Sequence, residues 1–402
     1  MEIRLKKYVS RELLISQGIS GLIGLISVSF TARYVGPEVF GFCSVVVLLL
    51  VIGTSLSDFG ACSWAARELA ANNISKYFFK LIMLKKSNLN YFFLIFALPI
   101  YQITPDNLKY SAILTIYPYL WNRYNYVQQF LLTIQRVRIS ILLLFVDRGS
   151  WLLIIPFQFL GLDPVLAFSL PLLTGLILHD TVSRKIIWNQ VVQSQTENLS
   201  GFSSTRSKSR NFGKIGLLGV VGNLDGLLVG ALTNISESGN YLVSQRFRSP
   251  LALVYYSIGV RLKVIAAKRD KNILKMEMRK DLSLFSLGIF VNIQIAIFSY
   301  FFSGLLVGSD FIDISLSLFF GTLTAIPLGI SYLASGLISA MGEDAFAARA
   351  QGVYVFSLLS FICLGANLLG SQGAVITSFA ANSIYALCLS LKLRSTLKFD
   401  PV

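Results

Sequence analysis

Residues 13–33 read LLISQGISGLIGLISVSFTAR, and the first charged side chain in this stretch is Arg33 at its end. At a rise of about 1.5 Å per residue, a helix of about 20 residues crosses the hydrocarbon core of a bilayer, which is about 30 Å thick. The apolar run is continuous and does not alternate as the strands of a membrane barrel do. The stretch therefore predicts a transmembrane helix.

The rest of the chain repeats this pattern. Of the 402 residues, 54% are hydrophobic and only 14% are charged, against about 25% charged residues in soluble domains. The charges gather in short segments between the apolar stretches. We therefore predict an all-α polytopic membrane protein with about twelve transmembrane helices, at 13–33, 40–63, 86–104, 110–133, 139–160, 164–182, 212–233, 241–263, 282–307, 314–340, 346–369 and 372–392.

The distribution of Lys and Arg orients these helices. With the amino terminus inside, the cytoplasmic segments hold 29 of the 35 basic residues, and the external loops hold only Arg33 and Lys109. Because basic loops stay on the cytoplasmic side, we predict that both termini are cytoplasmic. The net charge of +15 then reflects topology and contact with anionic membrane lipids, and nucleic acid is not an expected partner.

A polar stretch and an internal repeat divide the chain into two halves. We predict an N-terminal six-helix lobe at 1–182, a cytoplasmic linker at 183–211 and a C-terminal six-helix lobe at 212–402. A shift of 198 residues superimposes four pairs of glycines: Gly18 and Gly216, Gly21 and Gly219, Gly24 and Gly222, and Gly41 and Gly239. Such glycines allow close helix packing, although glycine enrichment in membrane helices would also produce matches. Two lobes of even helix number are related by a pseudo-two-fold axis along the membrane normal, with a site between them.

Charged side chains within the predicted helices are the candidate functional residues, because each costs about 2.5 kcal/mol or more to insert. The repeat places Asp225 on Ser27 and Arg246 on Leu48, so the second half is charged where the first is not. The alternative is that these residues form buried ion pairs that fix packing. The set comprises Asp58, Arg123, Asp147, Arg148, Asp225, Arg246 and Arg248.

Several chemical classes find little support in the sequence. There is no GxxxxGK[ST] phosphate loop for ATP-driven transport. The one histidine, His179, lies beside Asp180, and we interpret the pair as an interfacial helix end. The predicted external loops are too short for the catalytic loops of membrane glycosyltransferases or polymerases. We expect a protein that is not an enzyme, with no catalytic residue, metal or cofactor. The cysteines, which we expect to be small core residues, are Cys43, Cys62, Cys363 and Cys388.

Three motifs resemble a known family. Asp225 to Gly230 gives DxxxxG, and Gly239, Tyr241 and Arg246 follow as GxY and an arginine five residues beyond. Residues 33–42 read RYVGPEVFGF, and residues 57–69 read SDFGACSWAAREL. The motifs resemble helices 7 and 8, the helix 1–2 turn and the end of helix 2 in polysaccharide or O-antigen repeat-unit flippases. These are the Wzx type of the multidrug/oligosaccharidyl-lipid/polysaccharide (MOP) exporter superfamily. The resemblance covers roughly 15–70 and 215–265, and the remainder agrees only in hydropathy.

The resemblance implies a flippase of the bacterial inner (cytoplasmic) membrane that serves lipopolysaccharide biosynthesis. Such proteins move undecaprenyl-diphosphate-linked oligosaccharide by alternating access through a cationic cavity between the lobes. Protons or sodium ions drive some members. The lipid-linked oligosaccharide is the implied substrate, and a polysaccharide polymerase and a chain-length regulator are the implied protein partners.

The membrane charges fit this implied function. An arginine offers a forked set of donors that stays charged, which suits a diphosphate. We expect substrate binding by Arg123, Arg148, Arg246 and Arg248, and ion coupling or arginine orientation by Asp225, Asp147 and Asp58. The competing interpretations are a cation-coupled multidrug exporter of the same superfamily and, third, a membrane repeat-unit polymerase. Four arginines against three aspartates favour an anionic ligand.

Overall fold

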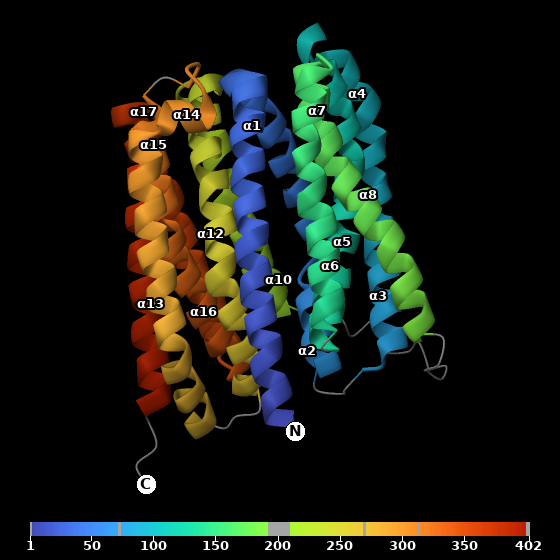
Figure 1. Ribbon diagram of the computed structural model, residues 1–402, viewed down its shortest axis with the longest axis vertical. Helices are drawn as coiled ribbons and strands as arrows, with labels where there is room; N and C mark the ends of the chain where they lie inside the picture. Colours follow the sequence, from blue (N-terminus) through green and yellow to red (C-terminus); the bar gives the residue numbers. More distant parts are fainter. Residues whose placement is uncertain are drawn as a thin grey trace. The chain divides into compact units, whose positions relative to one another are not determined.

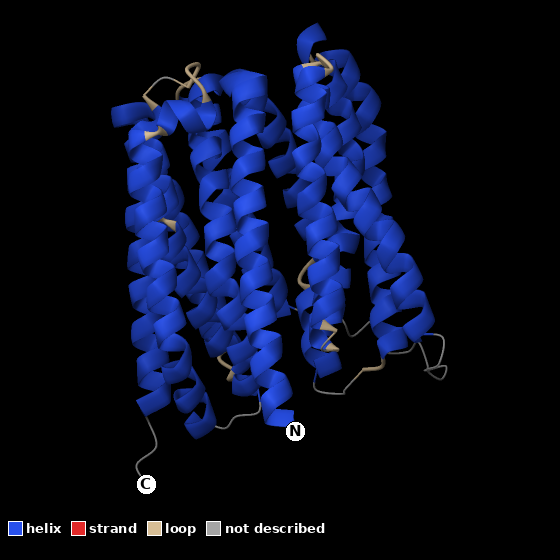
Figure 2. Cartoon of the chain, in the orientation of Figure 1, coloured by secondary structure: helices blue, strands red, loops and turns tan. Residues whose placement is uncertain are grey.

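The computed structural model describes residues 2–70, 74–134, 136–191, 210–267, 271–311 and 313–398. In these residues every regular element is a helix, as Figures 1 and 2 show. The all-α fold predicted from hydropathy is confirmed.

The first half begins with one long kinked helix. In α1 (Glu2–Asp58) the chain turns at Gly36, whose φ of 75° favours glycine. Pro37 follows, where a fixed φ suits the start of a new helix. The remaining elements are α2 (Ala61–Ala70), α3 (Lys76–Leu89), η1 (Asn90–Phe96), α4 (Ala97–Ile103), η2 (Asp106–Ile116), α5 (Tyr117–Thr133), α6 (Val137–Ser150), η3 (Trp151–Leu153), α7 (Ile154–Phe159) and α8 (Pro164–Val191).

The second half ends with a similar long helix. Its last element, α17 (Asp344–Lys398), is interrupted at Leu369 and Gly370, where the φ of Gly370 is 59°. The preceding elements are α10 (Arg210–Val221), η5 (Gly222–Leu224), α11 (Asp225–Leu232), α12 (Ile235–Ala267), α13 (Lys271–Phe301), α14 (Ser303–Val307), α15 (Ile314–Leu323) and α16 (Ala325–Ala340).

The helices agree with the predicted spans. Among the described residues, 7 helical segments are long and apolar enough to cross a membrane. Two of them, Ser16–Asp58 with 43 residues and Asp344–Leu397 with 54, contain the kinks and each cover two predicted spans. The other predicted spans also fall on helices, apart from short turns. The chain is a multi-pass membrane protein.

Packing divides the chain into two compact units. Unit 1 comprises residues 1–41 and 224–402, and unit 2 comprises residues 42–223. The predicted lobes, 1–182 and 212–402, follow from the polar stretch and the internal repeat and not from packing, so their boundaries stay a prediction. Of the predicted linker, residues 183–191 continue α8 as helix, and residues 192–209 lie outside the described residues.

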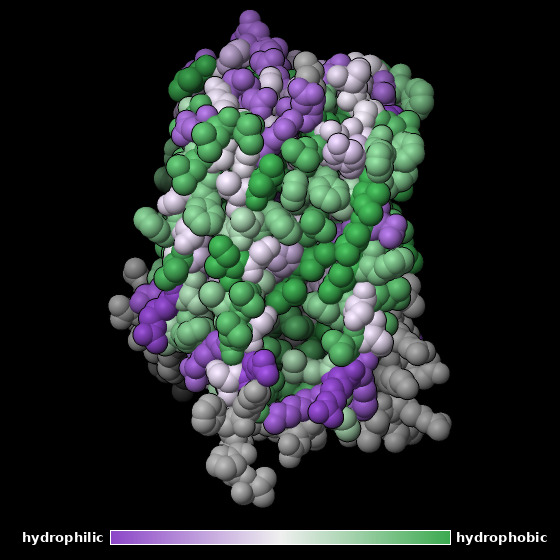
Figure 3. Space-filling model, turned by 90° about the vertical axis from the view of Figure 1, so that its left-hand side faces the viewer, coloured by the Kyte–Doolittle hydropathy of each residue, from purple (hydrophilic) through white to green (hydrophobic). Residues whose placement is uncertain are grey.

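One face of unit 1 has the surface of a membrane protein. Figure 3 shows hydrophobic side chains across the middle of this face and hydrophilic ones gathered toward its two ends. Because contiguous apolar surface of this size is rare in soluble monomers, the band fits contact with lipid. The exposed side chains on α13 and α17 include Leu282, Leu287, Phe290, Val353, Phe356 and Leu368.

Candidate functional site

Asp225 is a buried acid in unit 1. It begins α11, and only 5% of the residue is exposed. The Tyr241 hydroxyl on α12 donates a hydrogen bond to Asp225 Oδ2 at 2.6 Å, and the Gly226 backbone N–H donates to Oδ1 at 2.7 Å. Burying a charge without hydrogen bonds costs free energy, and these two hydrogen bonds offset part of that cost for the carboxylate.

Arg248 supplies positive charge close to this acid. It lies on α12, the helix that carries Tyr241, and interacts electrostatically with Asp225 and Tyr241. It also interacts with Tyr332 on α16 and Tyr354 on α17. Its Nε atom is buried and has no hydrogen-bond partner among the described residues. The guanidinium group therefore lies in the interior of unit 1 with part of its bonding capacity unused.

Tyrosines extend this region along α17. The rings of Tyr354 and Tyr385 stack at 4.3 Å. The Tyr354 hydroxyl donates to Asn382 Oδ1 at 2.9 Å, and the Tyr385 hydroxyl donates to Gln351 Oε1 at 2.6 Å. We call the whole set the Asp225 cluster, which comprises Asp225, Tyr241, Arg248, Tyr332, Gln351, Tyr354, Asn382 and Tyr385. It places one acid and one cation among polar and aromatic groups from α11, α12, α16 and α17.

The first-half and second-half motifs meet within unit 1. A Cβ atom on Gly239 would lie 2.0 Å from the carbonyl oxygen of Pro37, and one on Gly41 would lie 2.6 Å from that of Ile235. The repeat-related pair Gly41 and Gly239 thus allows close backbone approach, whereas a Cβ atom on Gly18 or Gly216, the pair predicted to do the same, would meet nothing within 4 Å. The Arg246 guanidinium lies 5.5 Å from the centroid of the Phe40 ring. Arg246 and Arg248 have different surroundings, as their spacing on the helix predicts.

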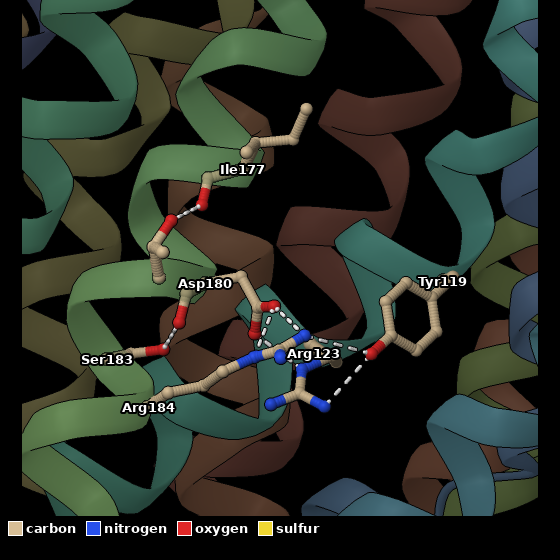
Figure 4. Close-up of polar contacts among 7 residues, drawn as sticks. Tyr119, Arg123, Ile177, Asp180, Ser183 and Arg184 are labelled. Carbon is tan, nitrogen blue, oxygen red and sulfur yellow. Dashed lines mark hydrogen bonds and ion pairs between the residues drawn. The ribbon is translucent and has the colours of Figure 1, made fainter.

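Arg123 lies in unit 2 and forms a buried ion pair. Its Nε donates to Asp180 Oδ1 at 2.5 Å, and its Nη1 donates to the Tyr119 hydroxyl at 3.1 Å. Arg184 binds the other oxygen, Oδ2, through Nε at 2.9 Å. Figure 4 shows the two arginines converging on Asp180 with Tyr119 beside them. We call Tyr119, Arg123, Asp180 and Arg184 the Asp180 cluster.

Arg184 is not among the candidate residues predicted from the sequence, and Asp180 does not lie at the predicted helix end. The predicted span ended at residue 182, but α8 continues to Val191. The interpretation of His179 and Asp180 as a helix end is wrong, because α8 continues eleven residues beyond Asp180, and both residues are buried. The His179 ring packs at 4.5 Å from that of Tyr124. The spacing of four residues between Asp180 and Arg184, which suits an ion pair on one helix face, was the available signal.

Asp147 and Arg148 contact each other in α6. Arg148 Nε lies 3.7 Å from Asp147 Oδ2, and its guanidinium lies 5.3 Å from the centroid of the Trp151 ring. Asp147 is buried against α8, where a Cβ on Gly175 would lie 3.1 Å from its Oδ1. This pair fits the packing alternative better than a shared binding role.

Asp58 joins three elements of unit 2. It ends α1, and its Oδ2 accepts a hydrogen bond from the Cys62 backbone N–H in the first turn of α2 at 3.3 Å. Its Oδ1 accepts one from the Tyr126 hydroxyl on α5 at 2.5 Å. An acid before a helix stabilises the first turn, so these contacts give Asp58 a structural role.

Comparison with known proteins gives matches in fold and none in sequence. Neither a scan of protein families nor a search of curated proteins found a match. Among solved structures, a MOP superfamily transporter from Pyrococcus furiosus, described as having a binding pocket of reversed polarity, matches with a TM-score of 0.71 and 13% identity. The match covers 98% of this chain and 96% of that one.

Other matches are MATE transporters. An outward-facing multidrug resistance MATE family transporter of the MOP superfamily has a TM-score of 0.68, 14% identity and 96% coverage of both chains. A variant MATE transporter from Vibrio cholerae has a TM-score of 0.65, 16% identity and 98% coverage of both chains. The chain therefore has the fold of MATE transporters of the MOP superfamily.

Proposed function

We propose that the chain is a cation-coupled exporter of the multidrug type, which moves an organic solute across the membrane by alternating access. The likeness in fold to MATE transporters over 96% or more of the chain carries this proposal. Fold alone does not fix function, so the proposal also has to agree with the charges inside the helices.

The pairing of the membrane arginines supports a multidrug substrate. The sequence argument for an anionic ligand counted four arginines against three aspartates. Asp180 adds a fourth acid to this balance and binds Arg123, while Asp147 neighbours Arg148. Arg184 binds the same acid, so the excess of one positive charge stays, but within the described residues two of the four arginines expected to bind substrate have an acid beside them.

Asp225 is the coupling group in this proposal. Binding of a proton or a sodium ion would neutralise the carboxylate and weaken its attraction for Arg248, leaving the Asp225 cluster with a net positive charge. Ionisable groups within membrane helices commonly serve such relays. A ligand shifts a conformational equilibrium only if its affinity differs between the two states. The bond from Tyr241 links the charge on α11 to α12, so neutralisation changes a contact between helices.

A drug-tolerance experiment tests this proposal. In a bacterial strain that lacks its own multidrug exporters, the wild-type chain should raise the tolerated concentration of ethidium several-fold. Asp225→Asn keeps the shape of the side chain but not its charge and should abolish the gain. The matched control is Asp106→Asn, because the Asp106 side chain is 92% exposed. Full tolerance with Asp225→Asn at equal expression would remove Asp225 from the coupling step.

A lipid-linked oligosaccharide flippase is the second candidate. The observation that favours it is the mutual contact of the residues that carry the resemblance: Gly239 with Pro37, Arg246 with Phe40, and Tyr241 with Asp225. The Pyrococcus furiosus transporter, described as having reversed pocket polarity, is a match with this fold too. Mass spectrometry of the lipids that co-purify with the protein tests this candidate. A polyprenyl-diphosphate saccharide would favour the flippase over the multidrug exporter.

A further inference from the structure

We propose that unit 1 has a binding site for a hydroxyl group between α12 and α13, formed by Tyr255 and Asn292. Tyr255 lies on α12 and is 1% exposed, and Asn292 lies on α13 and is 2% exposed. The Tyr255 hydroxyl interacts with the Asn292 side chain. However, neither the hydroxyl nor either amide atom of Asn292 has a hydrogen-bond partner of normal geometry among the described residues.

Three buried polar atoms thus have unused capacity for hydrogen bonds. A buried polar group without a partner costs free energy, and in folded proteins such groups are normally bonded to protein or to ordered water. The cost is higher within a bilayer, because lipid tails offer no donor or acceptor. A ligand that supplies the missing bonds would therefore stabilise unit 1.

The donors and acceptors of the site fit a neutral ligand. The Asn292 amide offers two N–H donors and one acceptor oxygen, and the Tyr255 hydroxyl can donate or accept. A hydroxyl group also does both, so one such group can bind the amide and the tyrosine at once. The amide N–H groups would repel a cation, and neither side chain carries the charge that a buried anion needs.

The packing around Tyr255 fixes its ring and leaves room beside its hydroxyl. A Cβ atom on Gly329 of α16 would lie 2.4 Å from the Cδ2 atom of the ring, and the Phe285 ring packs at 5.1 Å. Near the hydroxyl, a Cβ on Gly288 would lie 3.8 Å from the oxygen, an ordinary van der Waals distance. Gly288 is one helical turn before Asn292 and on the same face of α13. One more atom therefore fits next to the hydroxyl without a clash.

Two sources supply a hydroxyl group, namely water and an amphiphilic alcohol in the membrane. Water suits a small buried site with two or more polar partners. The alcohol is the second source because Leu287 and Val291, which directly precede Gly288 and Asn292, are 58% and 44% exposed, so the site is near the apolar surface of α13. Because it concerns binding within unit 1, this proposal stands or falls separately from the proposed transport activity.

A density map of the full-length protein that resolves ordered water tests the site directly. We expect a peak within hydrogen-bond distance of both Tyr255 Oη and the Asn292 amide. A direct hydrogen bond between the two side chains with no such peak would overturn the proposal.

Thermal unfolding in detergent measures what the bound hydroxyl contributes. Tyr255→Phe removes only the oxygen, and Asn292→Leu replaces the amide by an apolar group of similar size. Each variant should melt about 1–4 °C below the wild type, because the remaining polar groups lose their bridge. The double variant should lose less than the sum of the two, since both disrupt one bridge. The matched control is Tyr300→Phe, because Tyr300 also lies on α13 but is 42% exposed.

Octanol distinguishes the two sources. If an alcohol occupies the site, octanol should raise the melting temperature of the wild type relative to that of Tyr255→Phe, whereas equal responses of the two proteins would identify water. Removing polar groups that bind nothing stabilises a protein, so a Tyr255→Phe variant that melts at or above the wild-type temperature would overturn the proposal. That variant keeps the ring packed on Gly329, and its result decides even where Asn292→Leu does not fold.

Discussion

The hydroxyl of Tyr241 is one of two donors that hold the Asp225 carboxylate inside unit 1. Removing one partner of a buried hydrogen bond leaves the other without compensation. We expect Tyr241→Phe to lower the free energy of unfolding by about 1–3 kcal/mol, because the charged oxygen stays buried. The thermal unfolding of purified protein in detergent measures this loss. Tyr101→Phe is the control, since Tyr101 is 48% exposed.

A substitution of Asp58 tests whether this residue serves stability and not transport. Its bonds to the Cys62 backbone and the Tyr126 hydroxyl are within unit 2 and serve packing. We expect Asp58→Ala to lower stability by about 0.5–2 kcal/mol, as for other lost helix caps. Each folded molecule should still transport at the wild-type rate. A loss of transport without a loss of stability would instead assign Asp58 to the coupling step.

At the scale of elements, the crossing of α1 and α12 is the contact that tolerates least change. A Cβ on Gly239 would lie 2.0 Å from a backbone oxygen of Pro37, so the two helices would have to move apart. We expect Gly239→Ala to destabilise the protein by about 1–3 kcal/mol or more, as overpacking does.

Gly216 provides the matched control for this crossing. It also belongs to the repeat, but a Cβ there meets nothing within 4 Å. Gly216→Ala should therefore leave stability unchanged or slightly raised, because alanine favours the helix. The yield of monodisperse protein and its melting temperature distinguish the two variants. Equal melting temperatures would show that the crossing does not limit stability.

At the scale of the whole molecule, the sequence predicts the helices better than the contacts between them. Length and hydropathy locate the spans, and the kinks at Gly36 and Gly370 fall between predicted spans. The pairing of Arg123 with Asp180 joins residues 57 positions apart, which no local pattern encodes. The predicted cytoplasmic linker includes Arg184 because hydropathy reports where a helix leaves the apolar layer and not where the helix ends.

The residues of the candidate site, like the helices and their contacts, could be predicted only in part. The charge pattern and the repeat directed attention to the second half, where the structure has Asp225 near Arg248. Tyr241 belongs to the GxY motif, but Tyr332, Tyr354 and Tyr385 gave no signal, because aromatic residues at helical spacing are common in apolar cores. Their role follows only from packing, which brings α16 and α17 against α12.

Reconstituted transport tests the central claim most directly. Purified protein in liposomes is supplied with tetraphenylphosphonium, an organic cation, or with a fluorescent polyprenyl-diphosphate saccharide, and a proton or sodium gradient is imposed. The account predicts gradient-dependent movement of tetraphenylphosphonium by the wild type and none by Asp225→Asn. Movement of the saccharide lipid alone would contradict the multidrug assignment, and movement of neither substrate under either gradient would contradict the exporter itself.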